Sequence, residues 1–176
     1  VDTGTGGLGV APTGTNTFTG TLTGTGGLTM SGTGTLELAN ANTFTGATTI
    51  SSGTLRLAAA NALPSGTPLT LATGATLNLN GHTASLGKLD GAGNIILGSA
   101  NLTVAQASNS AFTGVLSGSG GLTKIGAGTL TLSGGILELA NNSALAFARN
   151  TTVTASTTIE SDRLTNGVGL THTLGT

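Results

Sequence analysis

Internal repetition is the feature that most constrains how this chain can fold. A Phe-Thr-Gly phrase occurs three times, at 17–20, 43–46 and 111–114. Residues 22–29 read LTGTGGLT and residues 116–123 read LSGSGGLT, while the phrase LELAN at 36–40 returns unchanged at 137–141. Comparable positions often lie roughly 20–28 residues apart, which is the period of solenoid repeats. The sequence therefore predicts a stack of similar units.

Within the repeats, apolar residues alternate with polar ones, as in a strand with one buried face. The alternating apolar pairs are Leu36/Leu38, Leu55/Leu57, Leu69/Leu71, Leu77/Leu79, Ile95/Leu97, Leu102/Val104, Leu130/Leu132 and Leu137/Leu139. No stretch carries the apolar spacing of an amphipathic helix over three turns. The Ala-rich segment 57–63, closed by Pro64 and Gly66, is the best candidate for one short helical turn. We predict an all-β chain.

Short strands separated by Gly-rich corners suit either a β-sandwich or a parallel β-helix. Near-identical phrases about one coil apart favour the β-helix, because equivalent residues then stack about 4.7–4.9 Å apart. We expect a single β-helix (β-solenoid) segment over residues 1–176, forming part of a longer repeat array. It would have about seven or eight coils and a length of about 35–40 Å.

Stacking also explains the unusual composition. Stacked leucines are expected to fill a narrow interior in which large aromatic side chains would not fit, and glycine supplies positive φ at the corners. Glu37 and Arg56 occupy equivalent outward positions on neighbouring coils. We expect them to pair across the strands for a few tenths of a kcal/mol.

Composition excludes several classes of protein. Charged residues make up 6% of the chain and the net charge is −1; a nucleic-acid partner is excluded, because binding phosphates needs a clustered basic surface. No apolar run reaches the ~18 residues of a membrane helix, so no membrane insertion is expected. The chain contains no cysteine. It starts at Val1 without a signal peptide, and we expect it to be cut from a longer protein.

The phrases resemble the passenger-associated transport repeat, also called the autotransporter-associated β-strand repeat. The clearest copy runs from Gly24 to Leu57, and a second opening half runs from Gly118 to Gly135. The lysine usual in the family is present as Lys124, whereas the first copy has Met30 in its place. Residues 77–104 look like the spacer common in such proteins. The resemblance covers most of the chain and is weaker over the last 40 residues or so.

The resemblance implies a right-handed parallel β-helix displayed outside Gram-negative bacteria. It implies adhesive or structural roles, or assistance in secretion. No catalytic residue belongs to the repeat, so no catalytic, cofactor-binding or metal-binding residue is assigned and no cofactor is expected.

Because β-helices also carry carbohydrate-active enzymes, we weighed the polar residues individually. Glu160 and Asp162 would lie about 7 Å apart on one strand face, which falls within the about 5–10 Å that glycoside hydrolysis requires; a solvated charged strand explains them better. Glu37 and Glu138 lie in identical phrases about four coils apart. His82, in an Asn-Gly-His turn, and the isolated His172 suggest no metal site. Irregularly spaced Thr-x-Thr pairs also leave ice binding as a minor alternative.

We therefore predict a non-enzymatic scaffold segment of a secreted or cell-surface bacterial protein. The expected partners are other copies or further repeats of the same protein, stacked end to end into a fibre or long stalk. The alternative is an adhesin-type module that binds surface glycans. A carbohydrate-active enzyme is the weaker third possibility.

Overall fold

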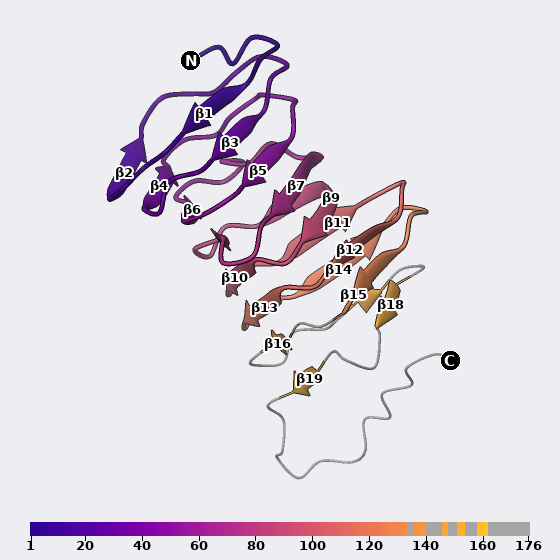
Figure 1. The fold of residues 1–176 in the computed structure, drawn as a ribbon. Helices are drawn as coiled ribbons and strands as arrows, with labels where there is room; N and C mark the ends of the chain where they lie inside the picture. Colours follow the sequence, from indigo (N-terminus) through magenta and orange to yellow (C-terminus); the bar gives the residue numbers. More distant parts are fainter. Residues whose placement is uncertain (134–135, 140–145, 148–150, 154–157, 162–176) are drawn as a thin grey trace.

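The computed structural model describes residues 1–133 continuously and, beyond them, residues 136–139, 146–147, 151–153 and 158–161. All regular secondary structure in these residues is strand, so this part of the chain has no helix that could cross a membrane. Figure 1 shows the strands stacked coil upon coil along one axis, with the N-terminus at one end. The predicted parallel β-solenoid is confirmed.

One sheet has eleven strands and the other has eight. The main path of the eleven-stranded sheet is β1 (Leu8–Val10), β3 (Leu28–Met30), β5 (Thr48–Ile50), β7 (Thr67–Leu71), β9 (Ala84–Gly91), β11 (Leu102–Ala105), β14 (Leu122–Ile125) and β17 (Ala146–Phe147). Its side branch is β12 (Ser110–Phe112), β15 (Leu130–Leu132) and β18 (Thr151–Val153). The eight-stranded sheet is β2 (Thr15–Phe18), β4 (Thr35–Leu38), β6 (Thr54–Leu57), β8 (Thr76–Asn78), β10 (Asn94–Gly98), β13 (Val115–Gly118), β16 (Ile136–Leu139) and β19 (Thr158–Ser161).

Each strand pairs in parallel with the equivalent strand of the next coil. Leu8 aligns with Leu28, and Leu28 aligns with Thr48. In residues 1–133 the path from β1 to β14 makes about six turns, slightly fewer than the seven or eight coils predicted. The difference arises because the expectation counted coils over all 176 residues, whereas only short strands are described beyond Ser133.

The cross-section changes at β9, which the sequence did not predict. This strand is 8 residues long. Its first part pairs with β11, while Gly91 at its end pairs with Phe112 of β12. After β9, each described coil therefore has a third strand. As a result, the three Gly-Thr-Leu-x-Leu phrases at 34–38, 53–57 and 128–132 are not all structural equivalents. The first two form β4 and β6 in the eight-stranded sheet, and the third forms β15 in the side branch.

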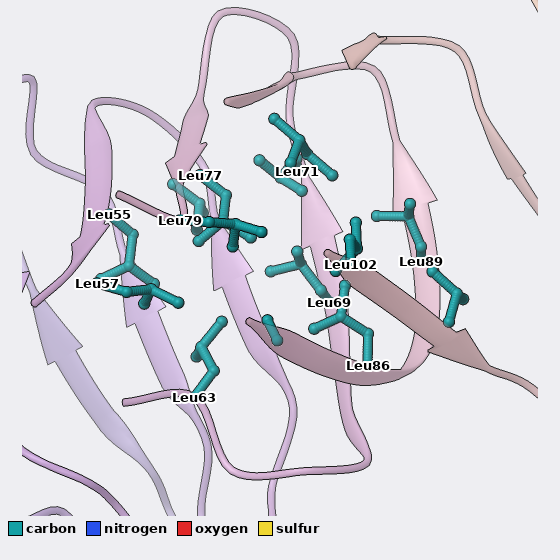
Figure 2. Close-up of a cluster of buried hydrophobic side chains, with 14 of the residues drawn as sticks. Leu55, Leu57, Leu63, Leu69, Leu71, Leu77, Leu79, Leu86, Leu89 and Leu102 are labelled. Carbon is teal, nitrogen blue, oxygen red and sulfur yellow. The ribbon is translucent and has the colours of Figure 1, made fainter. Parts of the chain in front are cut away.

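Apolar residues of successive coils line up inside the solenoid. Leu36, Leu55, Leu77, Ile95 and Leu116 form one continuous column in register, and all five are buried. Figure 2 shows leucines from neighbouring coils, including Leu55 and Leu77, filling the space between the strands. Full burial of such a side chain contributes roughly 1.5–3 kcal/mol, so the repeated leucines are the main source of stability.

The expectation that aromatic side chains would not fit is wrong. Phe44 is fully buried and Phe112 is 1% exposed. The Phe112 ring lies against Gly114 of its own coil, because a Cβ on Gly114 would come within 2.8 Å of Phe112 Cζ. The glycine two residues after this phenylalanine thus leaves space for the ring.

The Ala-rich segment 57–63 forms a turn instead of the helical turn considered from the sequence. Asn61 adopts φ 57°, a left-handed conformation that interrupts a right-handed helix. The N–H of Ala62 donates to Ala59 O at 3.3 Å. The segment therefore acts as a corner between β6 and β7.

A buried asparagine links three coils at another corner. Asn42 is 4% exposed. Its Oδ1 accepts the N–H of Leu22 at 2.7 Å, and its Nδ2 donates to Ala62 O at 2.6 Å and to Asn40 O at 3.1 Å. Leu22 and Ala62 each lie 20 residues from Asn42, so the side chain joins the coil before to the coil after.

Candidate interaction surface

The outer face of the eight-stranded sheet carries two columns of side chains in register. The first column is Thr15, Thr35, Thr54, Thr76, Asn94 and Val115. The second column is Thr17, Glu37, Arg56, Asn78, Ile96 and Ser117. Because side chains alternate along a strand, these columns face outward where their neighbours form the leucine core. We call them the outer columns; they present mostly hydroxyl and amide groups.

The predicted pairing of Glu37 with Arg56 is confirmed. The two residues are register partners on β4 and β6, and Arg56 Nη1 donates to Glu37 Oε2. Arg56 Nη2 also donates to Asn80 Oδ1 at 2.9 Å. The side chains are 37% and 20% exposed, so water screens the pair and its contribution stays below about 1 kcal/mol.

A second ion pair lies within β9, where Lys88 Nζ is 2.6 Å from Asp90 Oδ2. Asp90 Oδ1 accepts the N–H of Ala111 from the following coil at 3.3 Å. This carboxylate therefore connects two coils at the point where the third strand begins.

The carboxylates in the described residues serve as local structural partners. Glu37 and Asp90 pair with cations, and Asp2 Oδ1 accepts the N–H of Gly4 at 2.8 Å. Among the residues with described placement, no three His, Cys, Asp or Glu side chains gather where they could hold a metal ion.

The structure places only some of the polar residues considered as site candidates in the sequence. Position 138 on β16 is five strand steps from Glu37 on β4, one more than expected, because the coils here are shorter than the spacing suggested. The N–H of His82 donates to Leu79 O at 2.8 Å within a turn. The side chain of Glu160, together with Asp162 and His172, lies outside the described residues.

The N-terminal end of the stack is an open, partly apolar edge. We define the N-terminal edge as Leu8, Val10 and Phe18, on the terminal strands β1 and β2. These side chains are only partly buried, although they pack against the core. Their partners one coil later, Leu28, Met30 and Leu38, are fully buried. The difference arises because β1 and β2 are terminal strands, paired on one side only.

Sequence reasoning missed the buried polar side chains, among them Asn42, Gln106 and Lys124. Gln106 accepts the hydroxyl of Ser110 at 2.8 Å and donates to Thr129 O at 2.7 Å. Lys124 had been noted only as a match to the family pattern. The strand alternation places Gln106 inward after Leu102 and Val104, and Lys124 inward after Leu122.

Comparisons with known proteins support the resemblance to the passenger-associated transport repeat. Residues 28–57 match the family model described as Passenger-associated-transport-repeat. The chain is 41% identical over 139 residues to the Adhesin BmaC autotransporter of Brucella suis biovar 1 (strain 1330). That alignment covers 74% of this chain and 4% of the adhesin, so the chain spans a small part of its relative. No solved structure matches the chain significantly. Similarity to an autotransporter passenger implies a secreted segment at the cell surface.

Proposed function

Because this chain is a segment of a passenger-associated transport repeat protein, we propose that it is a non-enzymatic length of stalk, extended by stacking a further coil of the same protein onto its N-terminal edge. Each coil of a solenoid contacts only its neighbours. The stalk can therefore lengthen without any new type of contact.

The observation that carries this proposal is the exposure difference between the first two coils. Leu8 and Val10 are partly exposed where Leu28 and Met30 are completely buried. Covering such half-exposed side chains would stabilise the stack by roughly 1 kcal/mol each. The free side of β1 also presents unpaired backbone groups, which favour the addition of another strand.

We expect a further coil, and not an unrelated partner, to bind the N-terminal edge, because the inward side chains of successive coils form continuous columns. An added strand would extend the column of Val10, Met30 and Ile50. Its backbone would meet β1 as β1 meets β3, in parallel and in register. A parallel coil with inward Leu, Val or Ile satisfies both requirements, and the repeat itself supplies such coils.

The test compares two lysine substitutions on the same strand by sedimentation velocity over a range of concentrations. We expect the unmodified chain to associate as concentration rises. Val10→Lys places a charge in the apolar column and should abolish association. Gly9→Lys is the matched control, because a Cβ there meets nothing within 4 Å, and it should still associate. A chain that stays monomeric at high concentration would overturn the proposal.

Adhesion is a second candidate role, supported by the name of the adhesin relative and by the regular outer columns. Phe18, Phe44 and Phe112 lie in or against the core, so they are not displayed for stacking on sugar rings. A glycan ligand would have to bind through hydroxyl and amide groups. Glycan-array binding that disappears in a Thr54→Val, Thr76→Val double variant would support adhesion.

Carbohydrate hydrolysis has less support. It needs a pair of free carboxylates about 5–10 Å apart, and Glu37 and Asp90 are each engaged by a cation.

A further inference from the structure

The same sequence motif forms a corner in both copies of the repeat, and the two corners are closed in different ways. The corner follows β3 in the first copy, where the sequence from 26 to 34 is GGLTMSGTG. It follows β14 in the second copy, where residues 120–128 read GGLTKIGAG. Both corners lie in close contact with the backbone of the preceding coil. A Cβ on Gly34 would lie 2.2 Å from Gly14 O, and a Cβ on Gly128 would lie 2.2 Å from Ser108 O. The two backbones differ within the corner, since Gly126 adopts φ 84° whereas the equivalent Gly32 does not adopt a positive φ.

In the first copy, the corner carbonyls are bound by the next coil. Ser52 Oγ is placed to donate to Ser31 O at 2.7 Å and to Gly32 O at 3.1 Å. Ser52 lies 21 and 20 residues further along the chain. Met30 is fully buried below this corner, and its Cε would lie 2.9 Å from a Cβ on Gly53. The apolar Met30 side chain thus reaches the corner but offers it no donor.

In the second copy, the corner carbonyls are bound from inside their own coil. Lys124 occupies the position of Met30 and is 0% exposed. Its Nζ donates to Ile125 O at 2.9 Å and to Gly126 O at 2.7 Å. Ile125 O also accepts the N–H of Gln106 at 3.2 Å. Neither ion pair in the described part of the chain involves Lys124, so carbonyl oxygens and not a carboxylate accept the hydrogen bonds of its ammonium.

We propose that Lys124 is an intra-coil clamp, which binds the corner carbonyls from within its own coil as Ser52 binds those of the first copy from the next coil. In a coil with methionine at this position, the corner carbonyls receive their side-chain donor only when the following coil docks. A coil with lysine completes the corner by itself, because the donor and both acceptors lie within three consecutive residues. Lysine coils are therefore suited to hold their shape as the temporary or permanent end of a stack.

A double-mutant cycle tests this equivalence at the first corner. In the unmodified chain, Ser52→Ala leaves corner carbonyls without their donor, and we expect the unfolding equilibrium constant to rise about tenfold. In a Met30→Lys background the new ammonium supplies that donor, so the same Ser52→Ala change should alter the constant less than about twofold. The free-energy cost of burying the ammonium is common to both lysine variants, so it cancels in the double-mutant cycle. Equal effects of Ser52→Ala in the two backgrounds would overturn the proposal.

A second measurement stays informative if Met30→Lys fails to fold. Lys124→Met keeps the apolar stem and removes the ammonium. Hydrogen exchange should then accelerate about tenfold at the amide of Gly128, which donates to Gln106 O at 3.0 Å, while the amide of Gly34 in the first copy stays unchanged. Lys88→Met removes a 37% exposed ammonium and serves as the control that should leave both amides unaffected. Unchanged exchange at Gly128 in Lys124→Met would refute the clamp.

Discussion

Replacing Asn42 by alanine tests whether single polar side chains hold the coils together. The change would leave the buried N–H of Leu22 and the carbonyl of Ala62 without their side-chain partners at 2.7 and 2.6 Å. An unsatisfied buried group costs about 1–3 kcal/mol, so two such groups predict a loss of about 2–6 kcal/mol. A natural domain has about 5–15 kcal/mol in total. One amide therefore accounts for a large part of the stability.

The assay is urea unfolding followed by far-ultraviolet circular dichroism, because the chain has no tryptophan or tyrosine to report by fluorescence. Asn40→Ala is the matched control. This exposed residue lies two positions before Asn42, and its side chain donates to Thr19 O of the preceding coil. Its loss should cost less than about 1 kcal/mol. The same free-energy loss in both variants would show that water satisfies the freed groups, and the reasoning from burial would fail.

Three further substitutions probe the core, the surface and the corners. Thr48→Val removes a buried hydroxyl that has no hydrogen-bond partner, so the urea midpoint should rise by the equivalent of about 1–3 kcal/mol; a lower midpoint would contradict this. Glu37→Gln should lower stability by less than about 1 kcal/mol at low salt and by almost nothing in 1 M NaCl, and a salt-independent loss would rule out an ion-pair effect. Gly27→Ala puts a Cβ 1.9 Å from the carbonyl oxygen of Ala47, whereas Gly9→Ala meets nothing. Thermal unfolding should show a loss of about 1–3 kcal/mol or more for Gly27→Ala alone.

Much of the architecture was predictable because alternation decides which face of a strand is buried. The pattern Leu36, Glu37, Leu38 places the two leucines inward and the glutamate outward, and the structure does the same. The identical spacing of the next phrase predicted the partner of Glu37 correctly. Buried Phe112 was not predicted, although the glycine against its ring, Gly114, belongs to the same Phe-Thr-Gly phrase.

The role of Lys124 was equally hidden in the sequence. Alternation places position 124 inward, but only the path of the corner brings two carbonyl oxygens within reach of the ammonium. The third strand of each coil after β9 could not be predicted from the sequence either. Whether a phrase such as Gly-Thr-Leu-x-Leu forms β4 or β15 depends on how many residues the intervening corners use, and not on the phrase itself.

The sequence by itself determined that this protein is a stack of parallel coils with a leucine interior, because repetition and two-residue alternation act locally and need no knowledge of distant contacts. The tertiary structure alone decided which phrase stacks on which and which polar side chains close the corners. These outcomes depend on contacts between residues about 20 positions apart, and near-identical phrases leave several such pairings equally compatible with the sequence.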